Sequence, residues 1–529
     1  MAENLRAVIV VLGLSIPMLL FLRPQLTTIA IAPRDFRIRA GLWIALTLAL
    51  FLAQNFWLFV LIVVVALLVV GRRDSSPLGL YFFLLLLAPP VPAQIPGIGG
   101  INYFLSLDYL RLLSLVILLP HAVALARDPL VPRLFRLPAD KYLIGYLILQ
   151  LAIQSTTTTT TDAIRGAVSI AIDVFLPYYA FSRGLFDREK LRDAFAAFVA
   201  ACSVLALIAL FETLKGWLLY SSLPNFLGLT WSMGSYMLRN DTLRATASAG
   251  HSITLGFVFM VAIGLHLSLR SHFQSGRTWT LLLLALGAGL VATMSRGPWV
   301  GAAALALTAL ALSPTRGSNL AKLGLASIFV VPAMLFSPFG ERIIAVLPFV
   351  GTVSGESVDF RQQLFDLSWD VLMLNPLLGS PDYLANASIR TLSQGEEGLI
   401  DVVNSYLGVA LYSGFVGLAL FAGVFASSLI GLLTRLAGRR YFSEVDNEIG
   451  LALFATLVGV LVAIATLSSI NAIPVVYWSL AGACAAYLSW ADRAAHPDER
   501  PVQSVQLSAH SKNAGHLARR RQASKSLFE

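Results

Sequence analysis

Charged residues are scarce in this sequence. Asp, Glu, Lys and Arg make up 13% of the 529 residues, against about 25% in soluble proteins, while 57% are hydrophobic and the mean hydropathy is +0.75. Too few polar side chains remain to cover a water-facing surface around so many apolar ones. The composition therefore excludes a soluble globular protein. It predicts an all-α integral membrane protein, because the apolar residues come in runs of helix length.

Cysteine and the common cofactor motifs are also scarce. Cys202 and Cys484 both fall inside apolar runs, which excludes a disulfide framework and a cysteine-rich metal cluster. The sequence has no P-loop, no dinucleotide-binding glycine fingerprint and no metal-hydrolase spacing, so we expect no metal and no cofactor. The net charge is +9, but the arginines lie mainly in loops and the tail. That distribution follows the positive-inside rule, and no nucleic-acid partner is expected.

Apolar runs of roughly 20 residues, the length that crosses a bilayer, recur along the whole chain. They predict a polytopic bundle of about 12–14 transmembrane helices with one large periplasmic loop containing short helices. The spans are expected near residues 7–22, 42–70, 78–90, 103–124, 142–156, 164–182, 194–213, 251–269, 279–293, 298–313, 320–337, 404–434, 449–468 and 472–490.

The orientation follows from the loops. Residues 125–141, 183–193, 270–278 and 435–440 are rich in Lys and Arg and alternate with loops poor in cations, so the basic loops are expected in the cytoplasm. Both termini then lie in the cytoplasm if residues 42–70 form one helix. The pair Gln54-Asn55 leaves a hairpin open at that point. With one helix, loop 23–41 and its four arginines become an exception on the outside.

The transmembrane domain is expected to cover residues 1–491, with a basic, disordered cytoplasmic tail at 492–529. Periplasmic segments are expected at 214–250 and 338–403, and the second is mostly acidic. Within it, apolar residues recur at helical spacing, which predicts an amphipathic helix on the outer membrane surface. Its apolar positions are Phe360, Leu364, Leu367, Val371 and Leu374.

Arginines near the outer surface are the strongest candidates for chemistry. Arg296 lies in a short turn, Ser295-Arg296-Gly297, that links two spans on the cation-poor side. Because a guanidinium binds phosphate oxygens through two parallel hydrogen bonds, Arg296 is a candidate diphosphate ligand. The alternatives are contact with lipid headgroups and pairing with a loop carboxylate.

A second group precedes the span at 251–269. Arg244 is followed by small residues that let a ligand approach the backbone, and His251 begins the span. His251 is either a general base or a helix cap, and the cap is the more ordinary role. Arg239 and Arg361 are further outside cations, and several of them together would suit a diphosphate.

Carboxylates near or within the spans complete the candidates. Asp401 and Asn404 open a span, where capping is ordinary. Asp108 and Arg111 are spaced for an internal ion pair. Other acidic groups in or near the membrane are functional candidates by default, namely Asp173 and Glu212.

Four segments together resemble the O-antigen ligase/polymerase superfamily of bacterial envelope polysaccharide enzymes, over roughly residues 140–435. Each motif is short, but their order and topology agree with the family. The segments are Phe175-Leu176-Pro177-Tyr178-Tyr179 with Ser182-Arg183, residues 244–256, Ser295-Arg296-Gly297-Pro298-Trp299, and Asn375-Pro376-Leu377-Leu378-Gly379 followed by Asp401-Val402-Val403-Asn404-Ser405-Tyr406-Leu407 and Gly414-Phe415-Val416-Gly417-Leu418.

The resemblance implies transfer of an undecaprenyl-diphosphate-linked glycan at the periplasmic face of the bacterial inner membrane, without a metal or a nucleotide sugar. Its arginines, matching Arg244 and Arg296, would hold the diphosphate leaving group while an acceptor hydroxyl attacks the anomeric carbon. The expected partners are the lipid-linked glycan, a glycan or lipid acceptor, the bilayer, and a chain-length regulator and flippase of the same pathway. Further substrate-binding candidates are Arg239, Arg361, Asn404 and Tyr406.

The sequence departs from the ligase pattern at one position. Ligases of the family carry a histidine, taken as the base, directly before the asparagine that matches Asn404, and this chain has Val403 there. The departure favours a polymerase of O-antigen or exopolysaccharide repeat units over a ligase acting on lipid A-core. Asp401 or His251 would then be the base.

A flippase or transporter is the alternative from another class, but the cations cluster at one face and no internal repeat is evident. A purely structural membrane subunit is the remaining alternative.

Overall fold

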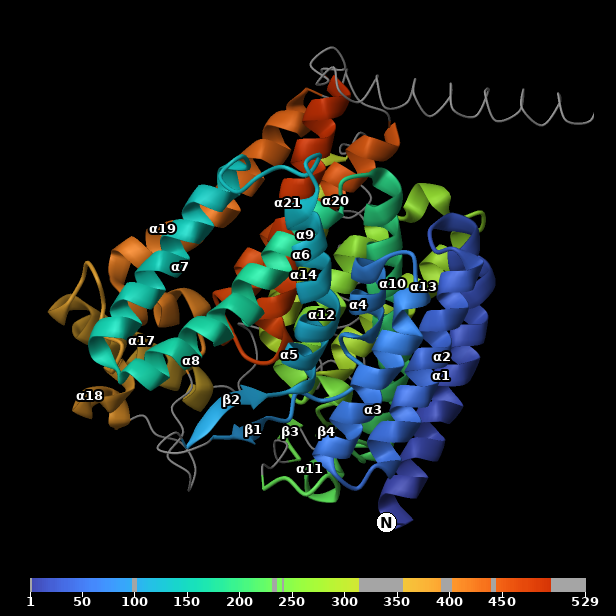
Figure 1. The fold of residues 1–529 in the computed structure, drawn as a ribbon, viewed down its shortest axis with the longest axis horizontal. Coiled ribbons are helices and arrows are strands. Elements are labelled where there is room, and N and C mark those ends of the chain that lie inside the picture. Colours follow the sequence, from blue (N-terminus) through green and yellow to red (C-terminus); the bar gives the residue numbers. More distant parts are fainter. Residues whose placement is uncertain are drawn as a thin grey trace, which may run out of the picture.

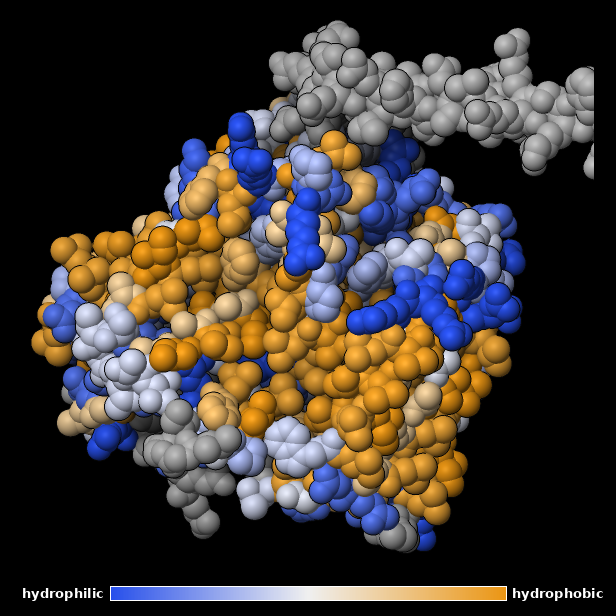
Figure 2. All heavy atoms as spheres, in the orientation of Figure 1, coloured by the Kyte–Doolittle hydropathy of each residue, from blue (hydrophilic) through white to orange (hydrophobic). Residues whose placement is uncertain are grey.

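The computed structural model describes residues 2–97, 102–230, 236–239, 242–313, 355–391, 402–438 and 444–495. Eight helices of this described part are long and apolar enough to cross a membrane, and three shorter apolar helices accompany them. Figure 2 shows a broad apolar surface with hydrophilic residues gathered toward its two ends, as a bilayer requires. The predicted class, an all-α multi-pass membrane protein, is confirmed.

The N-terminal region consists of three helices, α1 (Ala2–Ile29), α2 (Pro33–Leu52) and α3 (Phe56–Val69). Asn55 ends the continuity of the apolar run 42–70, because its side-chain oxygen accepts hydrogen bonds from the backbone N–H groups of Trp57 (2.8 Å) and Leu58 (3.1 Å) and caps α3. The break that Gln54-Asn55 left open is therefore present.

This extra helix changes the predicted topology of the N-terminal region. Residues 27–32 now line a cavity together with Glu189 and Arg192, at the end of the bundle that holds the basic loops, which we call the basic end. The arginines of loop 23–41 are no longer an exception. The start of α1 lies at the opposite end, where Ser222 donates a 2.6 Å hydrogen bond to Asn4 (Figure 1). The condition under which both termini were expected in the cytoplasm, a single helix over residues 42–70, is therefore not met.

The next segment enters the bundle without crossing it as a helix. After η1 (Gly71–Arg73), α4 (Pro77–Leu84) has eight residues, about 12 Å at the usual rise, so the span expected at 78–90 is wrong as a transmembrane helix. Residues 85–91 are buried and irregular. Carbonyl groups at and after the end of α4 find partners in the protein: Tyr109 donates to Leu84 O (3.1 Å), and Ser248 donates to Leu86 O. Such backbone is tolerated at membrane depth only when it is enclosed by protein.

Two short antiparallel hairpins lie at the end opposite the basic end, which we call the hairpin end (Figure 1). One pairs β1 (Ala93–Pro96) with β2 (Tyr103–Leu107), and the other pairs β3 (Leu238–Arg239) with β4 (Thr242–Leu243).

The remaining elements are helical and mostly run between the two ends. Two continuous helical stretches, α5–η2–α6 and α8–η3–α9, each contain a π-helical turn (η2 and η3), and these two turns pack together. In chain order the elements are α5 (Tyr109–Leu113), η2 (Ser114–Leu118), α6 (Leu119–Arg127), α7 (Pro138–Thr157), α8 (Thr160–Ile170), η3 (Ala171–Phe175), α9 (Leu176–Gly184), α10 (Arg188–Lys215), α11 (Leu223–Phe226), η4 (Ala247–Ala249), α12 (Ser252–Leu267), η5 (Arg270–His272), α13 (Gly276–Ala292), α14 (Arg296–Leu312), α17 (Gly355–Leu374), η7 (Tyr383–Ala385), α18 (Ala387–Arg390), α19 (Ser405–Ala437), α20 (Glu444–Ile464) and α21 (Ala472–Ala495).

Buried ion pairs connect helices near the basic end. The guanidinium of Arg39 binds Asp74 (2.8 Å) and Asp193 (2.9 Å), and the Arg39 and Asp74 side chains are fully buried. Arg183 binds Asp140 at 2.6 Å, again with both side chains buried. In these two clusters each buried charge has a counter-charge within hydrogen-bonding distance, which offsets the cost of burial in the membrane.

The predicted Asp108–Arg111 ion pair is wrong. Asp108 instead caps α5, accepting a 2.8 Å hydrogen bond from the backbone N–H of Arg111. The Arg111 side chain pairs with Asp173 of η3 at 2.6 Å. A carboxylate at the start of a helix is drawn to the free N–H groups of the first turn, which leaves the guanidinium for another helix.

Helix α19 is broken at Gly414, whose backbone (φ 65°, ψ −169°) is a conformation essentially restricted to glycine. The loop 376–380 fills the break: Phe415 N donates to Pro376 O (2.8 Å), and Ser380 N donates to Leu411 O (2.7 Å). The two motifs around Asn375–Gly379 and Gly414 are therefore one structural unit.

The helix predicted in segment 338–403 is present as α17, and it packs against α19. Leu364 and Val371 are buried as the apolar pattern requires, whereas Leu374 is 68% exposed. A second apolar stripe, which includes Phe365 and Trp369, is also exposed. The helix is thus apolar on two faces rather than one.

Candidate active site

The turn between α13 and α14 is fixed by local hydrogen bonds. Met294 adopts a positive φ of 48°, and Ser295 stands at the N-cap position of α14. Trp299, in the first turn of α14, reaches back and donates its indole N–H to Leu290 O at 3.0 Å. Pro298 is tolerated there because the first turn of a helix needs no N–H at that position. We call residues 293–296 the arginine turn, because it ends at Arg296, the first residue of α14.

Two further arginines converge on this turn from the β3–β4 hairpin. Arg244 donates from Nη2 to Ser295 Oγ (2.9 Å) and from Nε to Thr293 O (3.3 Å). Arg239 donates from Nη1 to Met294 O at 2.6 Å. The structure therefore brings Arg239 and Arg244 to the turn that carries Arg296.

The positive charge of Arg239 influences the pKa of Arg244. Burial, and then the nearby charge of Arg239, lower the pKa of Arg244 to about 10, so its guanidinium remains charged at neutral pH. Lowering of the pKa means that the surroundings disfavour the positive charge. An anion bound between the guanidinium groups would offset that cost and accept their charge-assisted hydrogen bonds.

A buried carboxylate holds the segment that carries Arg244. Glu212, near the end of α10, is fully buried and accepts three backbone hydrogen bonds: from Thr246 N (3.0 Å) and Ala247 N (2.8 Å) at Oε2, and from Leu219 N (3.0 Å) at Oε1. The membrane-embedded candidate Glu212 therefore has a structural role. Its carboxylate oxygens hold the backbone at Thr246 and Ala247, just after Arg244.

Small residues let the entry to α12 pack tightly beside the arginine turn. Gly250 has φ 77°, and a Cβ on Gly256 would lie 2.9 Å from Thr293 Oγ1 and 3.0 Å from Pro298. His251 occupies the N-cap of α12, where its Nδ1 accepts a 3.1 Å hydrogen bond from Ile253 N. The structure thus gives His251 the capping role that was the more ordinary of its two expected roles.

The loop between α20 and α21, residues 465–471, joins the arginine turn to a second feature. On one side, a Cβ at Gly297 would come within 2.5 Å of Thr466 Oγ1. On the other side, Ser405 donates to Leu467 O (2.8 Å) and Ser469 donates to Ser405 Oγ (2.8 Å). One loop therefore contacts both the residue after Arg296 and the start of α19.

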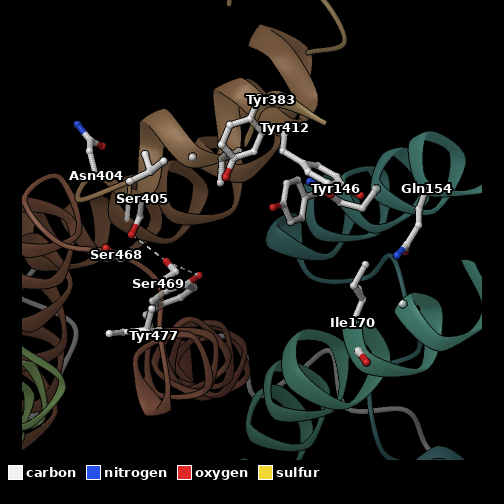
Figure 3. A pocket seen from close by; sticks show the side chains of 17 residues that line it. Tyr146, Gln154, Ile170, Tyr383, Asn404, Ser405, Tyr412, Ser468, Ser469 and Tyr477 are labelled. Atoms are coloured by element: carbon white, nitrogen blue, oxygen red, sulfur yellow. Dashed lines mark hydrogen bonds between the residues drawn. The ribbon is translucent and has the colours of Figure 1, made fainter. Parts of the chain in front are cut away.

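The second feature is a cavity of about 610 Å³, within the range typical of small-molecule sites. It lies between α7 and α8 on one side and the start of α19 with loop 465–471 on the other (Figure 3). Its lining is rich in hydroxyl, amide and aromatic groups, and the seventeen lining residues include no Asp, Glu, Lys, Arg or His. The main polar and aromatic ones are Tyr146, Gln150, Gln154, Tyr383, Asn404, Ser405, Tyr412, Ser468, Ser469 and Tyr477.

Such a lining suits a sugar, whose hydroxyl groups need both donors and acceptors and whose C–H faces pack against aromatic rings. The hydroxyl groups of Ser405, Ser469 and Tyr477 form a continuous chain of hydrogen bonds at one wall (Figure 3). The hydrogens of these groups can reorient, so the wall can donate or accept.

Of the remaining residues predicted from the sequence, one lines the cavity, one joins two helices, and the side chains of two are outside the described part of the chain. Asn404 caps α19, accepting from Tyr406 N (3.0 Å), and also lines the cavity. Tyr406 instead donates its hydroxyl to Leu461 O (2.9 Å), which joins α19 to α20. Asp401 and the side chain of Arg361 lie outside the described residues.

Sequence reasoning missed the cavity and the loop below it. The cavity residues are single polar positions inside apolar runs, contributed by helices far apart in the chain. The available signal was the polar sequence Ser468-Ser469 and Asn471 between two spans, together with Gln150 and Gln154 on one face of a helix.

Residues 280–422 match the family model described as O-antigen ligase. This segment begins in α13 and ends in α19, so it includes the arginine turn, the broken helix and Asn404. No curated protein matches the chain. The family match confirms the resemblance for the motifs at 295–299 and 375–418, which lie within it; the motifs at 175–183 and 244–256 lie outside the matched segment.

Proposed function

We propose that this membrane protein of the O-antigen ligase/polymerase superfamily polymerises glycan repeat units carried on undecaprenyl diphosphate, at the periplasmic face. The family accounts for a membrane glycosyltransferase. The observation that supports the finer proposal is the convergence of Arg239 and Arg244 on the turn of Arg296, next to an uncharged cavity of about 610 Å³. The cations would bind the diphosphate, and the cavity would bind the sugar beside it.

The reaction needs a place for the charge that develops on the leaving group. An acceptor hydroxyl oxygen forms a bond to the anomeric carbon while the bond from that carbon to the diphosphate oxygen breaks. The electron pair of the broken bond stays on the polyprenyl diphosphate. Guanidinium groups held beforehand at that oxygen stabilise the transition state more than the ground state. The contacts of Arg244 with Thr293 and Ser295 provide such fixed positioning.

The hydroxyl proton must pass to a base. His251 already uses Nδ1 in the cap of α12. Asp401 directly precedes Val402 and lies three residues before Asn404, and both of these line the cavity. We therefore assign the base to Asp401. Val403, which replaces the histidine of the ligases, is the reason to favour polymerisation over transfer to lipid A-core.

The test is genetic. In a strain lacking the gene, surface glycan is separated on a gel after complementation with wild type, Arg239→Ala, Arg244→Ala or Arg296→Ala. Arg277→Ala, an exposed arginine on α13 at the basic end, is the matched control. We expect single repeat units from the deletion strain and each of the three site variants, and full polymer from the control.

Other patterns would contradict the proposal. Full-length polymer accumulating on the carrier lipid would indicate a ligase, and repeat units retained in the cytoplasm would indicate a flippase. Normal glycan from all three arginine variants would remove the diphosphate assignment.

The orientation can be tested separately by cysteine labelling. Cys202 and Cys484 are buried, so an impermeant maleimide should report only new cysteines. Leu238→Cys at the hairpin end should react in cells whose outer membrane is permeable to the reagent. Leu130→Cys at the basic end should react only after the inner membrane is opened. The reverse pattern would place the arginine turn in the cytoplasm and end the enzyme proposal.

A further inference from the structure

A second cavity, of about 390 Å³, lies at the opposite end of the bundle from the arginine turn. Its walls are the segment 132–139 at the start of α7, the last turns of α19 and the last turns of α21. None of these residues belongs to the motifs of the family resemblance or takes part in the proposed reaction.

The lining of this basic-end cavity combines two cations with apolar surface. Arg136 and Arg435 approach it from two different elements, and Ser427, Ser428 and Thr434 add hydroxyl groups. No carboxylate is among the thirteen lining residues. Asp140, in the first turn of α7, is bound to Arg183 at 2.6 Å and is fully buried with it. A ligand of this cavity would therefore meet positive charge without a competing carboxylate from the described part of the wall.

The rest of the wall is apolar, as are the neighbouring surfaces. Leu137, Ala485 and Leu488 line the cavity. Outside it, Phe135 before α7 and Ile430 on α19 are 55% and 63% exposed. A free inorganic anion would gain nothing from these walls, whereas an amphiphile would cover them with its acyl chains.

We propose that this cavity binds the headgroup of an anionic phospholipid. The phosphate would lie between Arg136 and Arg435, and the acyl chains would descend along α19 beside Ile430. Basic pockets between transmembrane helices at the cytoplasmic side are suited to such headgroups. A zwitterionic lipid is disfavoured because the lining residues that the structure describes offer no carboxylate to its ammonium group. The inference does not rest on the proposed reaction.

The experiment measures lipid retained by the full-length protein. Protein purified in mild detergent is exchanged into nanodiscs or micelles containing equal amounts of phosphatidylglycerol and phosphatidylcholine, and bound lipid is counted by native mass spectrometry. The test variant is Arg136→Gln with Arg435→Gln. The matched control is Arg127→Gln with Arg133→Gln, two arginines of the same end that do not line the cavity.

We expect wild type and control to retain phosphatidylglycerol at least tenfold over phosphatidylcholine, and the test variant to lose that preference. Ser427→Phe, which fills the cavity and leaves both charges, should also lose the bound lipid while eluting normally on size exclusion. Equal retention by the test variant, or no preference in wild type, would overturn the proposal. Displacement of the lipid by 10-fold excess inorganic phosphate would show a free-anion site instead.

Discussion

Whether Glu212 holds the segment that carries Arg244 in place can be tested with the change Glu212→Gln. Oε2 of Glu212 accepts hydrogen bonds from two backbone N–H groups, Thr246 N and Ala247 N. If the amide keeps its oxygen toward Leu219 N, an NH₂ group faces those two donors. If it flips, Leu219 N loses its acceptor instead. In either orientation the buried site has more donors than acceptors, with almost no change in side-chain volume.

The magnitude follows from the number of bonds. A hydrogen bond to a charged group contributes about 1.5–3 kcal/mol, and a buried donor without an acceptor costs about 1–3 kcal/mol. The amide takes the orientation that loses fewer bonds, with its oxygen toward Thr246 N and Ala247 N and its NH₂ group toward Leu219 N. One bond to a charged group is then lost, so the native arrangement becomes less favourable by about 1.5–3 kcal/mol. A short loop is displaced more easily than the whole bundle unfolds. We expect Arg244 to be held less firmly at the arginine turn, with activity reduced roughly tenfold to a hundredfold.

The assay is polymer formation in cells and with purified protein, normalised to protein abundance. Thr213→Val is the matched control, because Thr213 is the next residue of α10 and donates a single 3.1 Å hydrogen bond to Ala292 O. It should reduce activity only several-fold. Should Glu212→Gln retain activity within twofold of wild type at equal abundance, the positioning of Arg244 by this carboxylate would be refuted.

Three further predictions concern the fold and the cavity. Arg39→Met leaves the carboxylates of Asp74 and Asp193 without their counter-charge and should lower stability by about 3–5 kcal/mol, seen as a lower unfolding temperature in detergent; an unchanged temperature would contradict this. Gly414→Ala places a Cβ against the Leu377–Leu378 backbone at a φ of 65° and should abolish accumulation of the protein, whereas Gly408→Ala has open space and should be neutral on an immunoblot. Because the described residues that line the large cavity include no cation, donors with a uronic acid at the reacting sugar should be transferred at least tenfold more slowly than uncharged ones; equal rates in a reconstituted assay would exclude this cavity as the sugar site.

The membrane class and the arginine cluster could be predicted because their signals are local or compositional. A cation on the cation-poor side of a topology stands out in the sequence, as Arg244 and Arg296 do. The structure adds that Arg244 donates a hydrogen bond to Ser295, the residue that directly precedes Arg296. What brings the two segments together is the tight packing of Gly256 on Pro298, a steric fit that no pattern of hydrophobicity encodes.

Other features could not be predicted because the deciding interactions join distant residues. Asp173 lies 62 residues from Arg111, and its pairing competes with the nearer Asp108, whose side chain is used at the start of α5. The short α4 was also missed, because the apolar segment after it resembles a continuing span. Its irregular backbone is stable only through donors such as Ser248, which come from another part of the chain.

The seven-residue loop 465–471 explains how the arginine turn and the large cavity can act as one site. Thr466 lies against Gly297, beside Arg296. Ser469 belongs to the hydrogen-bonded wall of the cavity, and Asn471 donates to Ala249 O (3.5 Å), in the segment that follows Arg244. A movement of this loop therefore changes the cavity wall and both arginine-bearing segments together. Since Thr466 lies tightly against Gly297, a sugar bound in the cavity as we propose would rest against the same loop that contacts both arginine-bearing segments.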